Sequence, residues 1–146
     1  MTDVAPGIRT AILANSTITD LLSTYSGAAS VHTRVPVPTG VSLPHVVVGP
    51  DVAISDFDGL RSDRPLIVRD VFVYGAAGSS RQDDYRNVEI IARELRSMFH
   101  RVKDSLTVDN YDVVSVEASG PTPAPSNDEE IVGRVVTLTI RLRSST

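Results

Sequence analysis

The sequence predicts a single α+β domain. Its sheet is small, mixed and mainly antiparallel, and packs against one long helix plus an N-terminal helix. Three observations support this: a long apolar stripe with helical spacing, strand-like stretches on both sides of it, and a length of 146 residues. The predicted order is helix, strand, strand, helix, strand, strand. Because a helix links the second and third strands, these two are expected to run parallel through a right-handed crossover.

The N-terminal helix is predicted over residues 4–14, where apolar side chains recur at helical spacing. Asp3 precedes it with a side-chain oxygen suited to helix capping. A second, shorter helical stretch is expected after a cap at Ser16 or Thr17, and Gly27 stops it.

Two strands are predicted before the long helix, over residues 45–49 and 65–74. The second carries apolar residues on both faces of its alternating pattern, so both faces are expected to be covered. One face would meet the long helix, and an adjacent subunit could cover the other. Residues 51–64 are polar and include an Asp-Gly turn signal, which predicts a protruding loop or a small separate hairpin.

The long helix is predicted over residues 80–103. Ser80 and Asp83 match a capping box at its start, and Arg101 and Lys103 suit the negative end of its dipole. The apolar stripe at three- and four-residue spacing comprises Val88, Ile91, Ala92, Leu95, Met98, Phe99 and Val102.

Two further strands are predicted over residues 111–118 and 131–143. A Pro-rich, acidic segment separates them, and residues 119–131 are predicted to form a second protruding loop. The last strand alternates cleanly between apolar and polar positions. Its residues expected to point inward are Val136, Leu138, Ile140 and Leu142.

The composition excludes several classes of protein. The chain has no cysteine, so it holds no disulfide and no thiolate metal site. A net charge of −4 argues against a general binder of nucleic acid or anionic membrane. No apolar run approaches the ~20 residues of a membrane span, and the first twenty residues lack a signal-peptide pattern. We therefore expect a soluble protein that works in the cytoplasm where it is made, or in an assembly built there.

Candidate catalytic groups are scattered. The three histidines lack the spacing of metal ligands. Asp83 and Asp84 are adjacent, so on a helix they point about 100° apart, and a role at the helix start explains them better. Residues 75–80 lie between a strand and a helix but lack the ending of a phosphate-binding loop. The sequence therefore predicts no catalytic residue, no metal and no cofactor.

The sequence carries a stronger signal for contact with another polypeptide than for catalysis. Phe57 and Leu60 lie among aspartates in a segment that is otherwise polar. Two such apolar side chains either pack back onto the domain or contact another chain. The candidate residues for a subunit or partner interface are Ile54, Phe57, Leu60, Arg61, Arg69, Val71 and Val73.

Five segments together carry a family resemblance. They are the I-x-x-L-L turn at 18–22, the L-P-H-V-V-V strand at 43–48, the R-D-V-F-V-Y strand at 69–74, the I-I-A-R-E-L helix at 90–95, and a final strand that alternates Thr and Arg. In these segments the chain resembles the tail terminator, or tail completion, proteins of long-tailed bacteriophages and related tail-like particles. Residues 120–127 depart from that pattern.

The resemblance implies a structural virion protein at the head-proximal end of the tail. Such proteins form a ring, usually a homo-hexamer, which stops polymerisation of the tail tube protein and joins the tail to the neck, or stopper, protein. DNA passes through the bore without specific binding, and no membrane is involved. An acidic bore avoids gripping phosphates. The candidate bore or loop-tip acids are Asp128, Glu129 and Glu130.

Two alternatives remain open. Within the same class, the chain could be another neck protein, a stopper or a head–tail adaptor, since small αβ neck proteins share similar layouts. In a different class, it could be a soluble α+β ligand-binding domain or an undetected enzyme. A joining protein should enter rings and bind the tail tube, whereas a ligand-binding domain should be a monomer or dimer with a closed pocket.

Overall fold

The computed structural model describes residues 3–33, 37–38, 41–58, 63–76, 82–124 and 131–144, with the backbone alone for residues 51–58, 63 and 82–84. The α+β class is confirmed, and the described elements outnumber those predicted. They are α1 (Ala5–Leu13), α2 (Ser16–Thr19), β1 (Thr24–Tyr25), β2 (Ala28–Ala29), β3 (Val31–His32), β4 (His45–Asp58), β5 (Asp63–Ala76), α3 (Gln82–Phe99), the 3-10 helix η1 (Lys103–Ser105), β6 (Tyr111–Pro123) and β7 (Ile131–Ser144).

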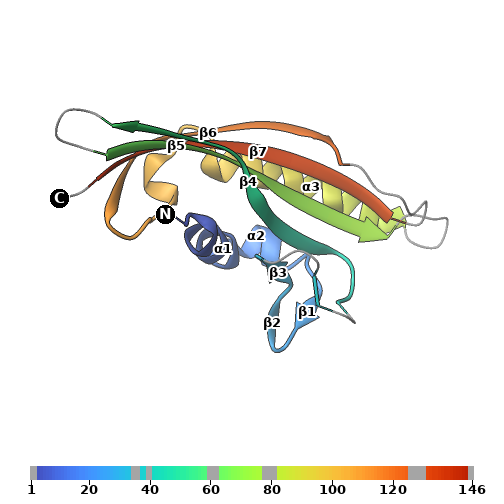
Figure 1. Cartoon of the computed structure of the whole chain (residues 1–146). Coiled ribbons are helices and arrows are strands. Elements are labelled where there is room, and N and C mark those ends of the chain that lie inside the picture. Colours follow the sequence, from blue (N-terminus) through green and yellow to red (C-terminus); the bar gives the residue numbers. More distant parts are fainter. Residues whose placement is uncertain are drawn as a thin grey trace.

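The main sheet has the strand order β3-β4-β5-β7-β6, and β1 and β2 form a separate small hairpin. β3 and β4 pair in parallel, and the other pairs of the main sheet are antiparallel. β5 and β6 run parallel as expected, but β7 lies between them and pairs with both. The three α-helices lie on one face of this sheet (Figure 1).

The strands are longer than the sequence pattern predicted. β4 continues to Asp58 and stays paired with β5 as far as Asp63. Residues 51–58, expected in a protruding loop, are therefore strand, and so are residues 119–123 at the end of β6. These residues were predicted as loops because they are polar. An antiparallel sheet with one face in water, however, carries polar residues on that face.

The N-terminal helix is held by its ends and by one face. The Asp3 carboxylate accepts a hydrogen bond from the Ala5 amide at 3.0 Å. The side chain of Asn15, rather than Ser16 or Thr17, caps α2 by accepting a bond from the Ile18 amide. Gly7 lets α1 approach the segment after α3, because a Cβ at this position would overlap the carbonyl oxygen of Thr107.

The core lies between α3 and the helix-side face of β5, β7 and β6. The predicted stripe of α3 is largely confirmed: Met98 is partly buried, whereas Val102 is 44% exposed. Val102 lies beyond the end of α3 at Phe99, and Arg101 adopts a left-handed backbone with φ of 61°. Fully buried stripe residues are Val88, Ile91, Ala92, Leu95 and Phe99, and on β7 the four predicted inward residues Val136, Leu138, Ile140 and Leu142 are buried.

The outer edge of β6 is partly occupied by the chain that leaves α3. The Arg101 amide donates to the Val116 carbonyl oxygen at 2.8 Å. The Ala118 amide donates to Nδ1 of His100 at 3.1 Å. These bonds use edge groups that would otherwise be available to another strand.

Candidate interaction surface

The face of the sheet opposite the helices, which we call the open face, carries mixed side chains. Successive residues of a strand point to opposite faces, and the odd-numbered positions of β5 from Pro65 to Gly75 are buried on the helix side. The even-numbered positions are only partly buried. On β5 and β7 the open face comprises Leu66, Val68, Asp70, Phe72, Tyr74, Val135, Thr137, Thr139, Arg141 and Arg143.

Two aromatic rings lie on this face next to glycines. Phe72 and Tyr74 stack with their ring centroids 6.0 Å apart and their planes 7° apart. A Cβ at Gly49 would lie 2.9 Å from the ring of Phe72, and one at Gly133 would lie 2.8 Å from the ring of Tyr74. The absence of a side chain at these two positions therefore lets the rings lie close to the neighbouring strands.

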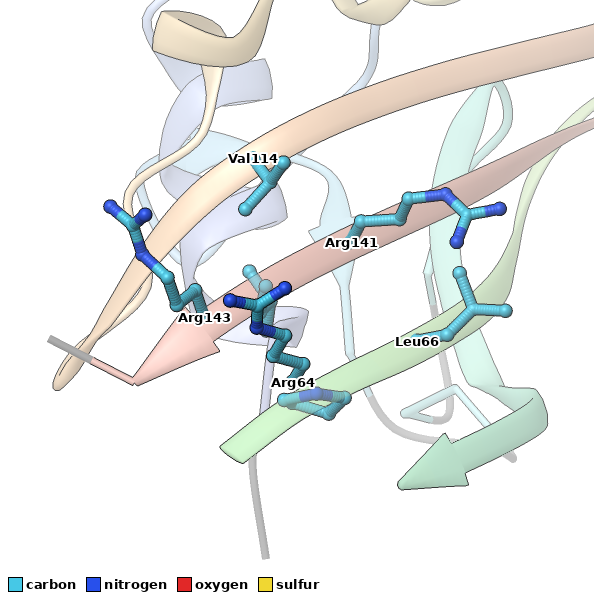
Figure 2. Close-up of a pocket in the computed structure, with 7 residues that line it drawn as sticks. Arg64, Leu66, Val114, Arg141 and Arg143 are labelled. Atoms are coloured by element: carbon cyan, nitrogen blue, oxygen red, sulfur yellow. The ribbon is translucent and has the colours of Figure 1, made fainter. Parts of the chain in front are cut away.

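At the other end of the open face lies a hollow of about 450 Å³ with a strongly basic lining, which we call the arginine hollow. Figure 2 shows the side chains of Arg64, Leu66, Val114, Arg141 and Arg143 that line it. Val114 is 51% exposed. The full lining is Arg64, Pro65, Leu66, Val114, Arg141, Leu142 and Arg143.

The charge of this hollow is opposite to that of the whole chain. The chain has a net charge of −4, whereas three of the described residues that line the hollow are arginines and none of them is an aspartate or glutamate. Arg143 contacts Asp112 at 3.5 Å, but both side chains are more than half exposed, so water screens this pair. An apolar floor with guanidinium groups around it suits a carboxylate-bearing segment of another polypeptide.

A second group of polar side chains lies where β3 pairs with β4. The Ser30 hydroxyl and Nε2 of His32 form a hydrogen bond at 2.7 Å. His32 and His45 have ring centroids 6.0 Å apart, and His45 lies 5.7 Å from Tyr74. Burial lowers the pKa of both histidines, and the positive charge of Arg9 lowers the pKa of His32 further. Ser30 is fully buried, so this pair is not an accessible nucleophile.

Three of the predicted interface residues are in the interior of the chain. Val71 and Val73 are 1% and 0% exposed, on the face that α3 covers. Arg69 is 8% exposed, donates from Nε to the carbonyl oxygen of Gly49 at 2.5 Å, and lies 3.6 Å from the Asp3 carboxylate. Their assignment to a partner contact is wrong, because the helices already cover this face.

For the remaining predicted interface residues and loop acids, the structure describes the backbone at most. Ile54 and Phe57 belong to β4, of which the backbone is described at these positions. Leu60 and Arg61 lie outside the described residues. The predicted bore or loop-tip acids Asp128, Glu129 and Glu130 also lie outside them.

Sequence reasoning missed the arginine hollow, although part of the signal was present. The outward positions of β7 include Arg141 and Arg143, two residues apart. The missing information was the strand order, which sets β5 and β6 on either side of β7 and so brings Leu66 and Val114 beside these arginines. No local pattern specifies that neighbourhood.

Other kinds of site find little support in the described part of the chain. Across residues 3–144, the described positions contain no group of three or more His, Asp or Glu side chains that could hold a metal ion. Among the described helices, none has the length and hydropathy needed to cross a membrane. The open face and its arginine hollow are the strongest candidates for a contact surface.

Comparison with known proteins finds a likeness in structure but no match by sequence. No protein-family model matches the chain, and no curated protein matches its sequence. A search of solved structures finds a chain described as part of the virion of a native gene transfer agent particle, with a TM-score of 0.74. The match covers 97% of this chain and 95% of that chain at 12% sequence identity. At this identity the likeness shows a shared fold.

Proposed function

We propose that this chain is a structural virion protein, a tail terminator without catalytic activity. The observation that carries the proposal is the likeness in fold to a chain of a gene transfer agent virion, over nearly the full length of both chains. The five sequence segments that resemble tail terminators support the same reading independently.

In this role, copies of the chain form a ring, proposed to be a hexamer, on the head-proximal end of the tail tube. A cyclic ring needs two different patches on each subunit, one for each neighbour. The open face supplies one such patch, because it carries partly exposed aromatic and aliphatic side chains and lies away from the α-helices (Figure 1). Ile54, Phe57, Leu60 and Arg61 remain proposed contributors to the other patch.

The proposed ring has three kinds of partner: further copies of itself, the major tail tube protein, and the neck or stopper protein of the filled head. DNA passes through its bore without specific binding, and Asp128, Glu129 and Glu130 remain the proposed acids of the bore or of a loop tip. Like charge between these acids and the phosphates would keep the passing DNA mobile.

Electron microscopy of particles assembled without this protein tests the role. A terminator predicts overlong tails that carry no heads, and supplying the wild-type chain should restore tails of uniform length with heads attached. Filled heads that leak DNA beside tails of normal length would instead assign the chain to the stopper position. Particles of normal shape and length would contradict any role in joining heads to tails.

A further inference from the structure

Two histidine rings meet where the edge strand β3 pairs with β4. The ring centroids of His32 and His45 are 6.0 Å apart. Tyr25 lies against the first ring at 5.3 Å, and Tyr74 lies against the second at 5.7 Å. Because these residues belong to β1, β3, β4 and β5, a row of four rings joins the small hairpin to the main sheet.

The interior accommodates the ring of His45 in its neutral form. His45 is 9% exposed, and its Nδ1 atom is buried with no hydrogen-bond partner in the described part of the chain. A protonated imidazole is a donor at both ring nitrogens. A charged His45 would therefore hold a buried N–H group without an acceptor, and such a group carries the full cost of its lost hydration.

The surroundings supply no negative charge for either ring. The charged and titratable groups that face the pair are Arg9 of α1 and the two tyrosines, and among the described residues no carboxylate contacts either ring. Burial is the main cause that lowers the pKa of both histidines; Arg9 lowers the pKa of His32 further, and His32 lowers that of His45. A hydrogen bond to the backbone of Ser42 raises the pKa of His45 but does not outweigh these causes. Two charged rings at this separation would repel each other in a poorly hydrated place.

The segment that carries His32 is attached to the sheet over a short length. We call residues 23–33, which include β1, β2 and β3, the hairpin segment. β3 pairs with β4 over two residues, whereas β4 and β5 pair along the length of β4. Within the hairpin segment only Ser30 and Val31 are buried, and Figure 1 shows the β1–β2 hairpin extending away from the main sheet. Segments with few buried side chains open locally before the whole domain unfolds.

Backbone hydrogen bonds fix the hairpin segment to the residues on either side of His45. The Ser23 amide donates to the Pro44 carbonyl oxygen at 3.0 Å, and the Val46 amide donates to the Ser30 carbonyl oxygen at 3.0 Å. A movement of the segment away from His45 therefore breaks these bonds together, and the same movement lets water reach the ring.

We propose that His32 and His45 form an acid-sensitive latch. While both rings are neutral, the hairpin segment stays against the start of β4, and protonation of the pair releases the segment while α3 and β4–β7 remain folded. Release gives both charged rings access to water and uncovers the edge of β4 at Val46 and Val47, where β3 was paired. The latch goes beyond the proposed function and does not depend on it.

Amide hydrogen exchange of the full-length chain, measured by mass spectrometry, tests the latch. Samples are compared at pH 7.5 and 5.5, with labelling times scaled for the intrinsic pH dependence of exchange. We expect peptides that cover the hairpin segment and Val46 to lose protection at least about tenfold at pH 5.5, because each proton bound by the open form alone raises its population about tenfold per pH unit. Peptides from α3 and β7 should keep their protection. Unchanged protection of the hairpin segment, or an equal loss throughout the chain, would overturn the proposal.

Three variants identify the groups responsible. His45→Phe and His45→Gln each remove the titrating ring, so the hairpin segment should stay protected at both pH values. His100→Gln is the control: His100 accepts a hydrogen bond from the Ala118 amide, away from the hairpin segment, and its loss should leave the acid response as in the wild type.

Acid-induced release that persists without His45, or that disappears in His100→Gln, would overturn the latch. Release already at pH 7.5 in both His45 variants would show that the ring holds the segment by packing alone, and it would overturn the role of protonation.

Discussion

Arg134 of β7 donates a hydrogen bond from Nε to the carboxylate of Glu89 on α3 at 2.6 Å, with both side chains less than one quarter exposed. The same guanidinium donates to the hydroxyl of Tyr85 at 3.1 Å and lies 5.5 Å from the centre of its ring. It also donates to the Gly133 carbonyl oxygen at 3.0 Å. One arginine thus fastens the first half of α3 to the sheet.

Arg134→Met should lower the free energy of unfolding by about 1–3 kcal/mol, because it leaves the Glu89 carboxylate without its charged donor in a partly desolvated position. Chemical denaturation checks this. The matched control is Arg143→Met, whose ion pair with Asp112 is more than half exposed and should contribute ~0–1 kcal/mol. Equal effects of the two substitutions would show that the α3 contact contributes no more stability than an exposed ion pair.

Leu95→Ala should destabilise the chain by ~2–5 kcal/mol, because Leu95 is fully buried and its removal leaves a cavity under α3. Ile90→Ala on the same helix is the control: Ile90 is 38% exposed, so the change should stay within about 0.5 kcal/mol. Urea unfolding of both variants gives the comparison. A loss below ~1 kcal/mol at Leu95 would contradict the packing described here.

Gly7→Ala should be destabilising by about 1–3 kcal/mol, although alanine is the better helix former. The added Cβ would overlap the Thr107 carbonyl oxygen, and backbone yields less easily than the end of a side chain. Thr10→Ala, an exposed position of the same helix, should be neutral or slightly stabilising. Thermal unfolding separates the two outcomes, and a rise in stability at Gly7 would refute the close approach.

Stability should fall as the pH is lowered below about 6.5. Burial lowers the pKa of His32 and His45 below their ordinary value of 6.5, so the unfolded chain takes up protons first. Their contribution is present in full above pH 6.5 and is lost as the pH falls toward the folded-state pKa values. Melting temperatures between pH 7.5 and 5 measure this slope.

The groups that surround His32 and His45 identify a variant that tests this pH dependence. His32 and His45 face each other and the rings of Tyr25 and Tyr74, and Arg9 is the cation that further lowers the pKa of His32. His45→Gln should flatten the slope below pH 6.5 relative to the wild type. An unchanged slope would assign the acid sensitivity to other groups.

Phe57→Ser combined with Leu60→Ser should abolish ring formation or head joining while leaving the far-ultraviolet circular dichroism close to that of the wild type. In the proposed assembly these two apolar side chains, which lie among aspartates in the sequence, contact a partner chain. Particle assembly assays and circular dichroism are measured on the same variant. Global unfolding would instead place both side chains in the core.

The sequence was sufficient to predict the helices and strands with a strong apolar periodicity. It was not sufficient to predict how the strands pair. The alternation of β7 identified its buried residues because one face is apolar throughout. β5 is apolar on both faces, so its pattern could not say which face meets α3, and the chosen face was wrong. Arg69 added to the error, because a charged residue is expected outside, yet here it donates to the Gly49 carbonyl oxygen in the interior.

Features that depend on neighbours distant in sequence were beyond a single-sequence reading. β3 consists of two residues and pairs with β4 at Val46 and Val47. The arginine hollow needs β7 inserted between β5 and β6. Propensity and spacing carry no information on either arrangement, because both are determined by tertiary packing.

The bonds from Arg101 and His100 to β6 bear on how this protein behaves at high concentration. A strand from another molecule cannot pair with the Val116 carbonyl or the Ala118 amide unless it first pulls the end of α3 away. Pairing of β6 with a strand of another molecule is therefore disfavoured along this part of the edge, which protects the folded chain from growth of a continuous sheet there.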